Sequence, residues 1–509
     1  MRWSYLPPLM VYLAAGIQGL TGIVGTFFIK DYLGLSAEFL AALGFWVGIP
    51  WALKMPIGHL VDVIWRYKSW LIVLGAALIA TSLIIMATLI GARDMLTQWA
   101  PANTWFVWSA LLAPVGYVLQ DAVADAMTVE AVPLVRSNGQ PFDENELKSM
   151  HTTMQTLGRV AIIGGTVLVA LLNLLIFSGT ENLPETERVA LYERVYWLAL
   201  CIPLISISGV LLHLFMQHRQ PSTALAQSPA AAAPNLWILG GSAAFAGFTV
   251  MMGLSEWRYA QEMIFLGSLG IIGFLMARLM RELSPSAKAT LLGTAVMIFL
   301  FRATPSAGPG VSWWMIDELK FDPPFFSQLS LIGSVLTLAG MFMFRRFMAE
   351  RPMWQVIVFL TVAGTLLSLP ILGMAMGLHH WTASVTGGVV DARFIALIDT
   401  ALESPLGQIS MIPMLAWIAN SAPQHLKATY FAVMASFTNL ALSASSLGTK
   451  YLNQGFVIER AAKDPQTLQI VTQANYSDLV PLLTWAMALG LLLPLAGILL
   501  ARALGWRST

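Results

Sequence analysis

Apolar runs of membrane-spanning length follow one another along almost the whole chain. A helix that crosses the hydrocarbon core of a bilayer needs about 20 mostly apolar residues. Of the 509 residues, 57% are hydrophobic and only 11% are charged, and the mean hydropathy is +0.71. A soluble domain has about 25% charged residues. The sequence therefore predicts an all-α polytopic membrane protein.

These runs define fourteen candidate spans, at about 8–29, 38–58, 70–91, 104–130, 150–178, 194–216, 237–255, 261–280, 289–305, 325–345, 353–376, 392–418, 428–450 and 478–503. With the N-terminus inside, the short inner loops after the second, eighth and tenth spans are rich in Lys and Arg, as cytoplasmic loops usually are. We expect a multi-pass protein of the cell (inner) membrane with both termini in the cytoplasm.

A segment rich in proline and small residues interrupts this pattern at 220–235, with the composition of a flexible cytoplasmic linker. Two Gly- and Ala-rich spans follow within 236–281, and we interpret them as an accessory transmembrane hairpin. Setting them aside leaves six spans in 1–219 and six in 282–509. Two six-helix bundles related by an internal repeat are typical of secondary transporters.

The fourth span carries three carboxylates, Asp121, Asp125 and Glu130. An ionisable side chain in hydrocarbon costs about 2.5 to 3.5 kcal/mol on insertion scales, so it persists mainly beside a protein interior or a water path. Asp121 and Asp125 are four residues apart and share one helical face. We expect these two to couple transport to protons. Glu130, near the cytoplasmic rim, is interpreted as a helix-end contact or part of an inner gate.

Three cations also lie within predicted spans, at Lys54, Arg159 and Arg302. Lys54 fits either a permanent ion pair with the span-four aspartates or a pair that protonation releases. Arg159 either pairs with the same carboxylates or binds substrate. Arg302 precedes the run 304–310, whose prolines and glycines must break the helix, and broken helices at membrane depth line cavities. We expect all three in substrate binding, with Arg302 gripping a carboxylate.

The fourth span of the second half repeats the paired-carboxylate spacing with Asp399 and Glu403. This fits a trace of the internal repeat, and it also fits coincidence. Both residues lie at an outer depth comparable to that of Arg302. We therefore expect them in the substrate site or in an outer gate with Arg302, with a static bridge as the alternative.

The loop after the second span contains Gly58, Asp62, Arg66 and Lys68 in the pattern G-x-L-x-D-x-x-x-R-x-K. This pattern resembles the signature between helices 2 and 3 of the major facilitator superfamily. Glycine permits close helix contact, the aspartate suits a helix N-terminus, and the basic pair suits the cytoplasmic face. We expect these four residues to act in gating.

Five stretches are similar to a narrower branch of that superfamily, the folate-biopterin transporter family. They are 50–58, 120–130, 303–306, 317–321 and 406–408 with Pro413. The resemblance implies proton-coupled uptake of a small organic anion of the folate or pterin type by alternating access. It also implies twelve spans, so the accessory hairpin is a departure from the family.

Other classes of function lack their signatures. The net charge of +1 does not suggest a nucleic-acid partner, and the single cysteine, Cys201, excludes an intrachain disulfide framework. We find no nucleotide-binding loop, metal-ligand spacing or catalytic motif, and we expect no enzyme, cofactor or metal. Alternatives are a carrier for another organic anion, a pigment-handling or photosynthetic-assembly protein on the same scaffold and, remotely, a membrane enzyme. The polar segment 450–478 is long enough for a short cap, but its function is not readable.

Overall fold

The computed structural model describes residues 3–52, 54–64, 67–133, 136, 140, 142–180, 183–218, 236–255, 257–282, 284–407, 409, 427–463 and 470–506. Apart from one pair of very short strands, every regular element in these ranges is a helix. The predicted all-α class is therefore confirmed. The predicted linker at 220–235 falls outside the described residues.

Nine helices in the described ranges are long and apolar enough to cross a membrane. They match the first six predicted spans and those at 325–345, 353–376 and 478–503. Two shorter apolar helices, Ala243–Gly253 and Ala260–Phe274, occupy the predicted hairpin. The remaining predicted spans contain helices too, but the total of fourteen stays a prediction.

By packing, the chain divides into two compact units. Unit 1 is Met1–Gly25 with Pro56–Phe245, and unit 2 is Thr26–Met55 with Ala246–Thr509. The division falls inside three helices, α2 (Gly22–Tyr32), α4 (Lys54–Val63) and α12 (Leu236–Leu254). Thr26–Met55 precedes the predicted linker, yet it packs with the later part of the chain. The predicted boundaries of the two six-helix bundles stay a prediction.

Unit 1 is a bundle of long apolar helices in which α5 packs on α7 and α1 packs on α8 and α10. A Cβ atom on Gly75 would lie 2.6 Å from the carbonyl oxygen of Gly116, so these glycines let α5 and α7 touch through their backbones. The elements of this unit are η1 (Trp3–Tyr5), α1 (Leu6–Gly16), η2 (Ile17–Thr21), α5 (Ser69–Gly91), α6 (Arg93–Thr97), α7 (Ala102–Ala131), α8 (Glu144–Phe177), α9 (Glu185–Ala199) and α10 (Cys201–His218).

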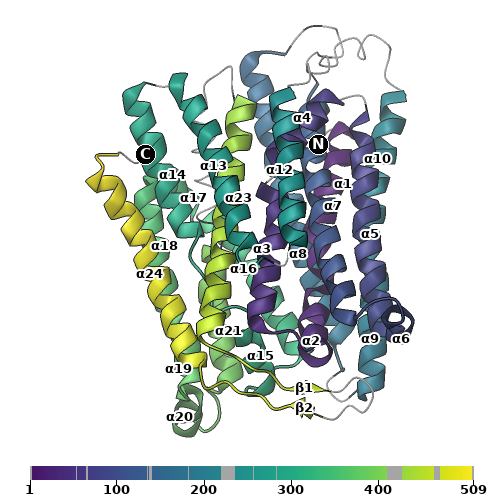
Figure 1. The fold of residues 1–509 in the computed structure, drawn as a ribbon, viewed down its shortest axis with the longest axis vertical. Helices are drawn as coiled ribbons and strands as arrows, with labels where there is room; N and C mark the ends of the chain where they lie inside the picture. The colour runs from purple at the N-terminus through teal and green to yellow at the C-terminus, as the bar shows by residue number, and fades with distance from the viewer. Residues whose placement is uncertain are drawn as a thin grey trace. The chain divides into compact units, whose positions relative to one another are not determined.

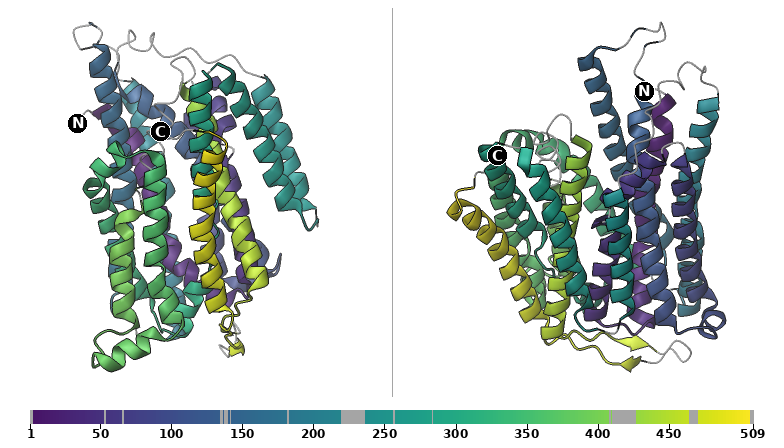
Figure 2. Two further views of the ribbon diagram at one scale, coloured as in Figure 1. Left: turned by 90° about the vertical axis from the view of Figure 1, so that its left-hand side faces the viewer. Right: turned by 45° about the horizontal axis from the view of Figure 1, so that its top comes forward.

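Unit 2 is built on α23, which packs against α3, α13 and α14. Its elements are α3 (Ala37–Ala52), α13 (Ala260–Leu279), η4 (Met280–Glu282), α14 (Pro285–Arg302), α15 (Gly310–Asp317), α16 (Pro323–Met343), α17 (Arg345–Glu350), α18 (Met353–Leu367), α19 (Leu369–Ala375), α20 (Leu378–Val385), α21 (Ala392–Glu403), η5 (Ser404–Leu406), α23 (Lys427–Gly455), β1 (Ala462–Lys463), β2 (Ile470–Thr472) and α24 (Leu479–Ala503) (Figure 1). Figure 2 shows β1 and β2 at the end of unit 2 where α23 finishes and α24 begins.

Local sequence chemistry sets the starts of several unit 2 helices. Asp322 accepts a hydrogen bond from the backbone N–H of Phe325 at 2.9 Å, and two prolines occupy the first positions of α16. Asp391 caps α21 in the same way, accepting from the N–H of Phe394 at 2.8 Å. An aspartate at the N-cap and proline in the first turn both favour a helix start. These caps fix where α16 and α21 begin.

Candidate functional site

The two predicted proton-coupling residues lie on one face of α7, and one of them, Asp125, contacts a tyrosine from α1. The hydroxyl of Tyr12 donates a 2.6 Å hydrogen bond to Oδ1 of Asp125. Tyr12 is buried, and both aspartates are half-buried. Asp121, Asp125 and Arg159 all act electrostatically on the Tyr12 hydroxyl. Unit 1 therefore brings together a group of four residues that we call the α7 carboxylate cluster: Tyr12, Asp121, Asp125 and Arg159.

A neutral hydroxyl is a suitable partner for a carboxyl group that changes its protonation state. A tyrosine O–H donates to a carboxylate, and its oxygen accepts from a carboxylic acid. The contact between Tyr12 and Asp125 can therefore survive gain and loss of a proton. Sequence reasoning missed Tyr12. The available signal was a hydroxyl-bearing side chain inside the first apolar run.

A second charged group lies at the end of α7. Lys68, which is buried, forms a 2.6 Å ion pair with Glu130. Nε2 of His213, on α10, lies 3.6 Å from the other carboxylate oxygen of Glu130. The loop that follows α4 is thus tied to α7 and α10. Sequence analysis had placed Lys68 and Glu130 in gating but did not include His213.

The other residues of the predicted gating motif are described only in part. Gly58 and Asp62 both lie in α4. The side chain of Asp62 and the whole of Arg66 fall outside the described residues. The gating role of the motif stays a prediction.

The predicted helix break in unit 2 is confirmed. Helix α14 ends at Arg302 and α15 begins at Gly310, with irregular backbone between them. Gly308 takes a φ of +79°, a left-handed conformation that favours glycine. Arg302 itself is half-buried at the last position of α14.

Three polar side chains of α23 form hydrogen bonds with the backbone of this break. Ser445 Oγ donates to the carbonyl of Thr304 at 2.6 Å, and Thr449 Oγ1 accepts from the N–H of Ser306 at 3.0 Å. Asn453 Nδ2 donates to the carbonyl of Ala307 at 3.2 Å. Because unpaired buried backbone groups are costly, these bonds make the irregular segment between α14 and α15 tolerable. The spacing of four between 445, 449 and 453 was the signal that sequence reasoning did not use.

The remaining predicted substrate residues of unit 2 lie on other helices, α4 and α21. Lys54 is half-buried at the first position of α4. Asp399 is buried in α21, and Glu403 follows one turn later and is exposed. Oδ1 of Asp399 has no hydrogen-bond partner within the described part of the chain. No ion pair among the described residues joins either carboxylate to Arg302, so their predicted gating contact stays a prediction.

The fold is shared with solved membrane transporters. A POT family transporter in complex with a thioalcohol-conjugated peptide superposes with a TM-score of 0.64 at 9% identity, covering 98% of this chain and 96% of that one. A nucleoside transporter gives a TM-score of 0.55 at 13% identity, covering 98% and 99%. These similarities show that the chain, with the apolar helices described above, has a multi-pass fold that solved membrane transporters share.

Sequence comparison then gives the family. The model of the BT1 family matches residues 15–505, and the chain belongs to the BT1 family. The folate-biopterin transporter of Synechocystis sp. is 25% identical over 507 aligned residues, covering 94% of this chain and 80% of that protein. The putative folate transporter 2 of Plasmodium berghei is 24% identical over 161 residues, covering 32% and 34%.

These comparisons confirm the family resemblance inferred from the sequence. They also confirm that the chain is a transporter and not an enzyme, since the similar proteins are transporters. The roles of individual site residues remain predictions, and we take them up next.

Proposed function

We propose that this protein is a secondary active carrier that takes up a small organic anion of the folate or pterin type together with protons, by alternating access. The observation that carries the coupling is the α7 carboxylate cluster, in which a membrane-embedded carboxyl group has a neutral hydroxyl partner. The similarity to a folate-biopterin transporter suggests the substrate class. In this proposal the protein lies in the cell inner membrane with both termini in the cytoplasm.

Each charged residue has a role in the proposed cycle. Asp121 and Asp125 take up the proton. Arg302, at the end of α14, grips a carboxylate of the substrate, because a guanidinium beside a carboxylate forms two parallel bonds. Arg159 and Lys54 add positive charge to the lining of the transport path. Asp399 and Glu403 line the part of this path that the second half of the chain supplies.

The direct test is uptake of radiolabelled folate and biopterin by cells that express the chain, with and without a proton uncoupler. We expect uptake above that of cells without the chain, and we expect the uncoupler to abolish accumulation. Uptake that is insensitive to the uncoupler would show that transport is not coupled to protons. If neither compound enters while another organic anion does, the substrate class is wrong.

Replacement of Arg302 by lysine tests how the substrate is held. Arg302→Lys keeps the charge but loses the paired donors, so affinity for carboxylated folate should fall by roughly tenfold, as expected for a charge-assisted bond. Affinity for an uncharged pterin should change by less than about twofold, because it has no carboxylate to lose. Competition for labelled folate uptake measures both values.

Arg393→Lys is the matched control for this experiment. Arg393 is exposed and pairs with Asp322 at 3.0 Å, at the start of α21 and away from the helix break. This variant should leave both affinities unchanged. An equal loss for both ligands in Arg302→Lys would instead identify a structural arginine.

A further inference from the structure

A cavity of about 610 Å³ lies in unit 2 where several of its helices have their ends. Helix α3 begins there at Ala37, α23 finishes there at Gly455, and the turn between α12 and α13 forms a third side. Its lining includes Glu38, Arg258, Tyr259, Lys450, Tyr451 and Gln454. None of these residues has a role in the transport cycle proposed above. The cavity therefore needs an explanation of its own.

The accessory hairpin supplies one wall of this cavity and is held there by polar contacts. Oε1 of Glu262, at the start of α13, accepts from Nζ of Lys450 at 3.0 Å and from the hydroxyl of Tyr451 at 2.5 Å. The neighbouring Gln261 donates through Nε2 to the backbone carbonyl of Ala42, in α3, at 3.0 Å. The start of α13 is thus fixed against both α23 and α3. These contacts hold the turn of the hairpin at the cavity.

Two charged side chains of the lining lie outside the pair of Lys450 with Glu262. Arg258, in the turn of the hairpin, is exposed, and its guanidinium lies 5.8 Å from the ring centre of Tyr259. Glu38 is half-buried, and its Oε1 accepts from Nε2 of Gln454, a neutral group, at 2.6 Å. Within the part of the chain that the structure describes, neither has an ion-pair partner. The cavity thus offers one positive and one negative group to a ligand.

Exposed aromatic side chains indicate the depth of the cavity in the membrane. Tyr259 and Tyr451 belong to its lining, Trp257 lies in the same turn of the hairpin, and all three are half-exposed. Trp and Tyr gather at the level of the lipid headgroups, where one end of the side chain is apolar and the other is wet. The span that begins at Ala37 is also long enough to cross a bilayer, so its end lies near that level. A phospholipid carries its phosphate at the same depth.

The hairpin also offers a surface for acyl chains. Met263, Leu266 and Phe274 of α13 are all exposed apolar side chains. Their separations of three and eight residues place them on one face of the helix. This face begins at Met263, directly after the residue that holds the hairpin to α23. A lipid at this place has polar partners for its headgroup and an apolar helix face for its chains.

We propose that this cavity binds the headgroup of a zwitterionic phospholipid of the ethanolamine type. The guanidinium of Arg258 takes the phosphate, because these two groups form paired charge-assisted bonds. The carboxylate of Glu38 takes the primary ammonium, which has three N–H groups to donate. A glycerol headgroup has no cation for Glu38, and a choline headgroup has no N–H. The accessory hairpin then serves to hold a lipid against α3 and α23, whatever the substrate of the carrier is.

Lipid binding to the purified full chain in detergent, measured by native mass spectrometry, tests the proposal. The probes are phosphatidylethanolamine, phosphatidylglycerol and phosphatidylcholine with identical acyl chains. The ethanolamine lipid should bind about tenfold more tightly than the other two, as expected for one charge-assisted hydrogen bond. Soluble glycerophosphoethanolamine, the same headgroup without chains, should not displace it at equal concentration. Displacement by this compound would overturn the lipid assignment in favour of a free zwitterion, and tighter binding of phosphatidylglycerol would overturn it in favour of an anionic lipid.

Two variants separate the two contacts of the headgroup. Glu38→Gln keeps the phosphate contact and loses the ammonium contact, so the affinities for the three lipids should agree within about twofold. Arg258→Gln loses the phosphate contact, so binding of all three lipids should weaken by about tenfold while the preference for ethanolamine remains. Neither side chain is fully buried, so each variant should fold.

Glu459→Gln and Arg393→Gln are the matched controls. Both side chains are exposed in unit 2, and neither is among the lining residues of the cavity. They should change neither the affinities nor the order of the lipids. The proposal is overturned if Glu38→Gln keeps the preference for ethanolamine, if Arg258→Gln binds like the parent, or if the controls weaken binding as much as the cavity variants. Because no transport is measured, such a failure would leave the proposed folate or pterin uptake untouched.

Discussion

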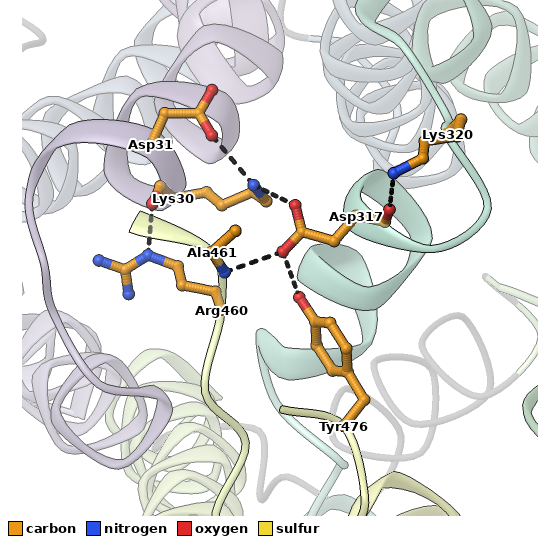
Figure 3. A network of polar contacts seen from close by, with 7 residues as sticks. All are labelled: Lys30, Asp31, Asp317, Lys320, Arg460, Ala461 and Tyr476. Carbon is orange, nitrogen blue, oxygen red and sulfur yellow. Dashed lines mark hydrogen bonds and ion pairs between the residues drawn. The ribbon is translucent and has the colours of Figure 1, made fainter. Parts of the chain in front are cut away.

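The α7 carboxylate cluster of unit 1 and a polar network of unit 2 both place a carboxylate beside a tyrosine hydroxyl at 2.6 Å. The second group, which we call the Asp317 network, consists of Lys30, Asp317, Arg460 and Tyr476 (Figure 3). They differ in their surroundings. Asp317 is also held by the ammonium of Lys30 at 2.5 Å, whereas Asp125 lies in a cluster with a second carboxylate, Asp121, and with Arg159. Asp125 is half-buried within a membrane-spanning helix, and Asp317 ends a short helix outside the long spans.

The two contacts therefore suit different tasks. The contact of Tyr12 with Asp125 suits a carboxyl group that gains and loses a proton, and the contacts of Asp317 suit a joint that is broken by movement. An ammonium can only donate, so its contact with a carboxyl group is strong only while that group is a carboxylate. A hydroxyl can remain bonded in either protonation state. We therefore expect unit 1 to respond to protons and the Asp317 network to respond to conformation. The predictions below test this contrast.

The largest effect is expected from Asp125→Asn and Asp121→Asn. A gradient of one pH unit is worth about 1.4 kcal/mol per proton, or a tenfold concentration ratio of solute. Variants that cannot bind the coupling proton should lose this accumulation and approach a ratio of about one, while exchange of labelled for unlabelled substrate persists. Accumulation and exchange measured in the same vesicles would decide the point.

Asp317→Asn serves as the comparison for that experiment. It should change the rates of accumulation and exchange together, because both require the Asp317 network to open, and it should keep the final ratio. If instead Asp121→Asn and Asp125→Asn both accumulate substrate like the parent, the coupling role assigned to the α7 carboxylate cluster is wrong.

A smaller effect is expected when each tyrosine is replaced by phenylalanine. Tyr12→Phe removes a donor that favours the carboxylate form of Asp125, so the pH of half-maximal uptake should rise by roughly 0.5 to 1 unit, the equivalent of one hydrogen bond. Tyr476→Phe should leave this pH unchanged and alter only the rate of uptake. Equal shifts in the pH of half-maximal uptake for both variants would contradict the difference proposed between the two regions.

The smallest effect concerns the pH dependence of the Asp317 network. Burial, together with the hydrogen bond to Asp317, raises the pKa of Tyr476 above its ordinary value near 10. A raised pKa means that the contribution of the protonated hydroxyl is fully present below about pH 10 and is lost only as the pH rises through the higher value. The ratio of exchange rates between Tyr476→Phe and the parent should stay constant from pH 7 to 9. A ratio that falls toward one in this range would contradict this assignment.

Local chemistry made part of the site predictable. Pro305 and the glycines after it cannot continue a helix, so the end of α14 followed from the sequence. The spacing of four between Asp121 and Asp125 placed them on one face because α-helical periodicity acts within a single turn. The partners of these residues did not follow, since Tyr12 and Asp125 are 113 positions apart.

The sequence by itself determined the membrane class, the helical fold, the family and the helix break, because apolar run length and proline chemistry act within each segment. Only the tertiary structure decided that Tyr12 bonds to Asp125, that α23 serves the broken helix and that Arg460 reaches back 430 positions to Lys30. Lys30 and Asp317 lie at the ends of helices and Arg460 lies beyond the end of α23, so no helical or strand period predicts their contacts. Their contacts come from packing of distant segments, where burial of charge requires a partner that no local rule specifies.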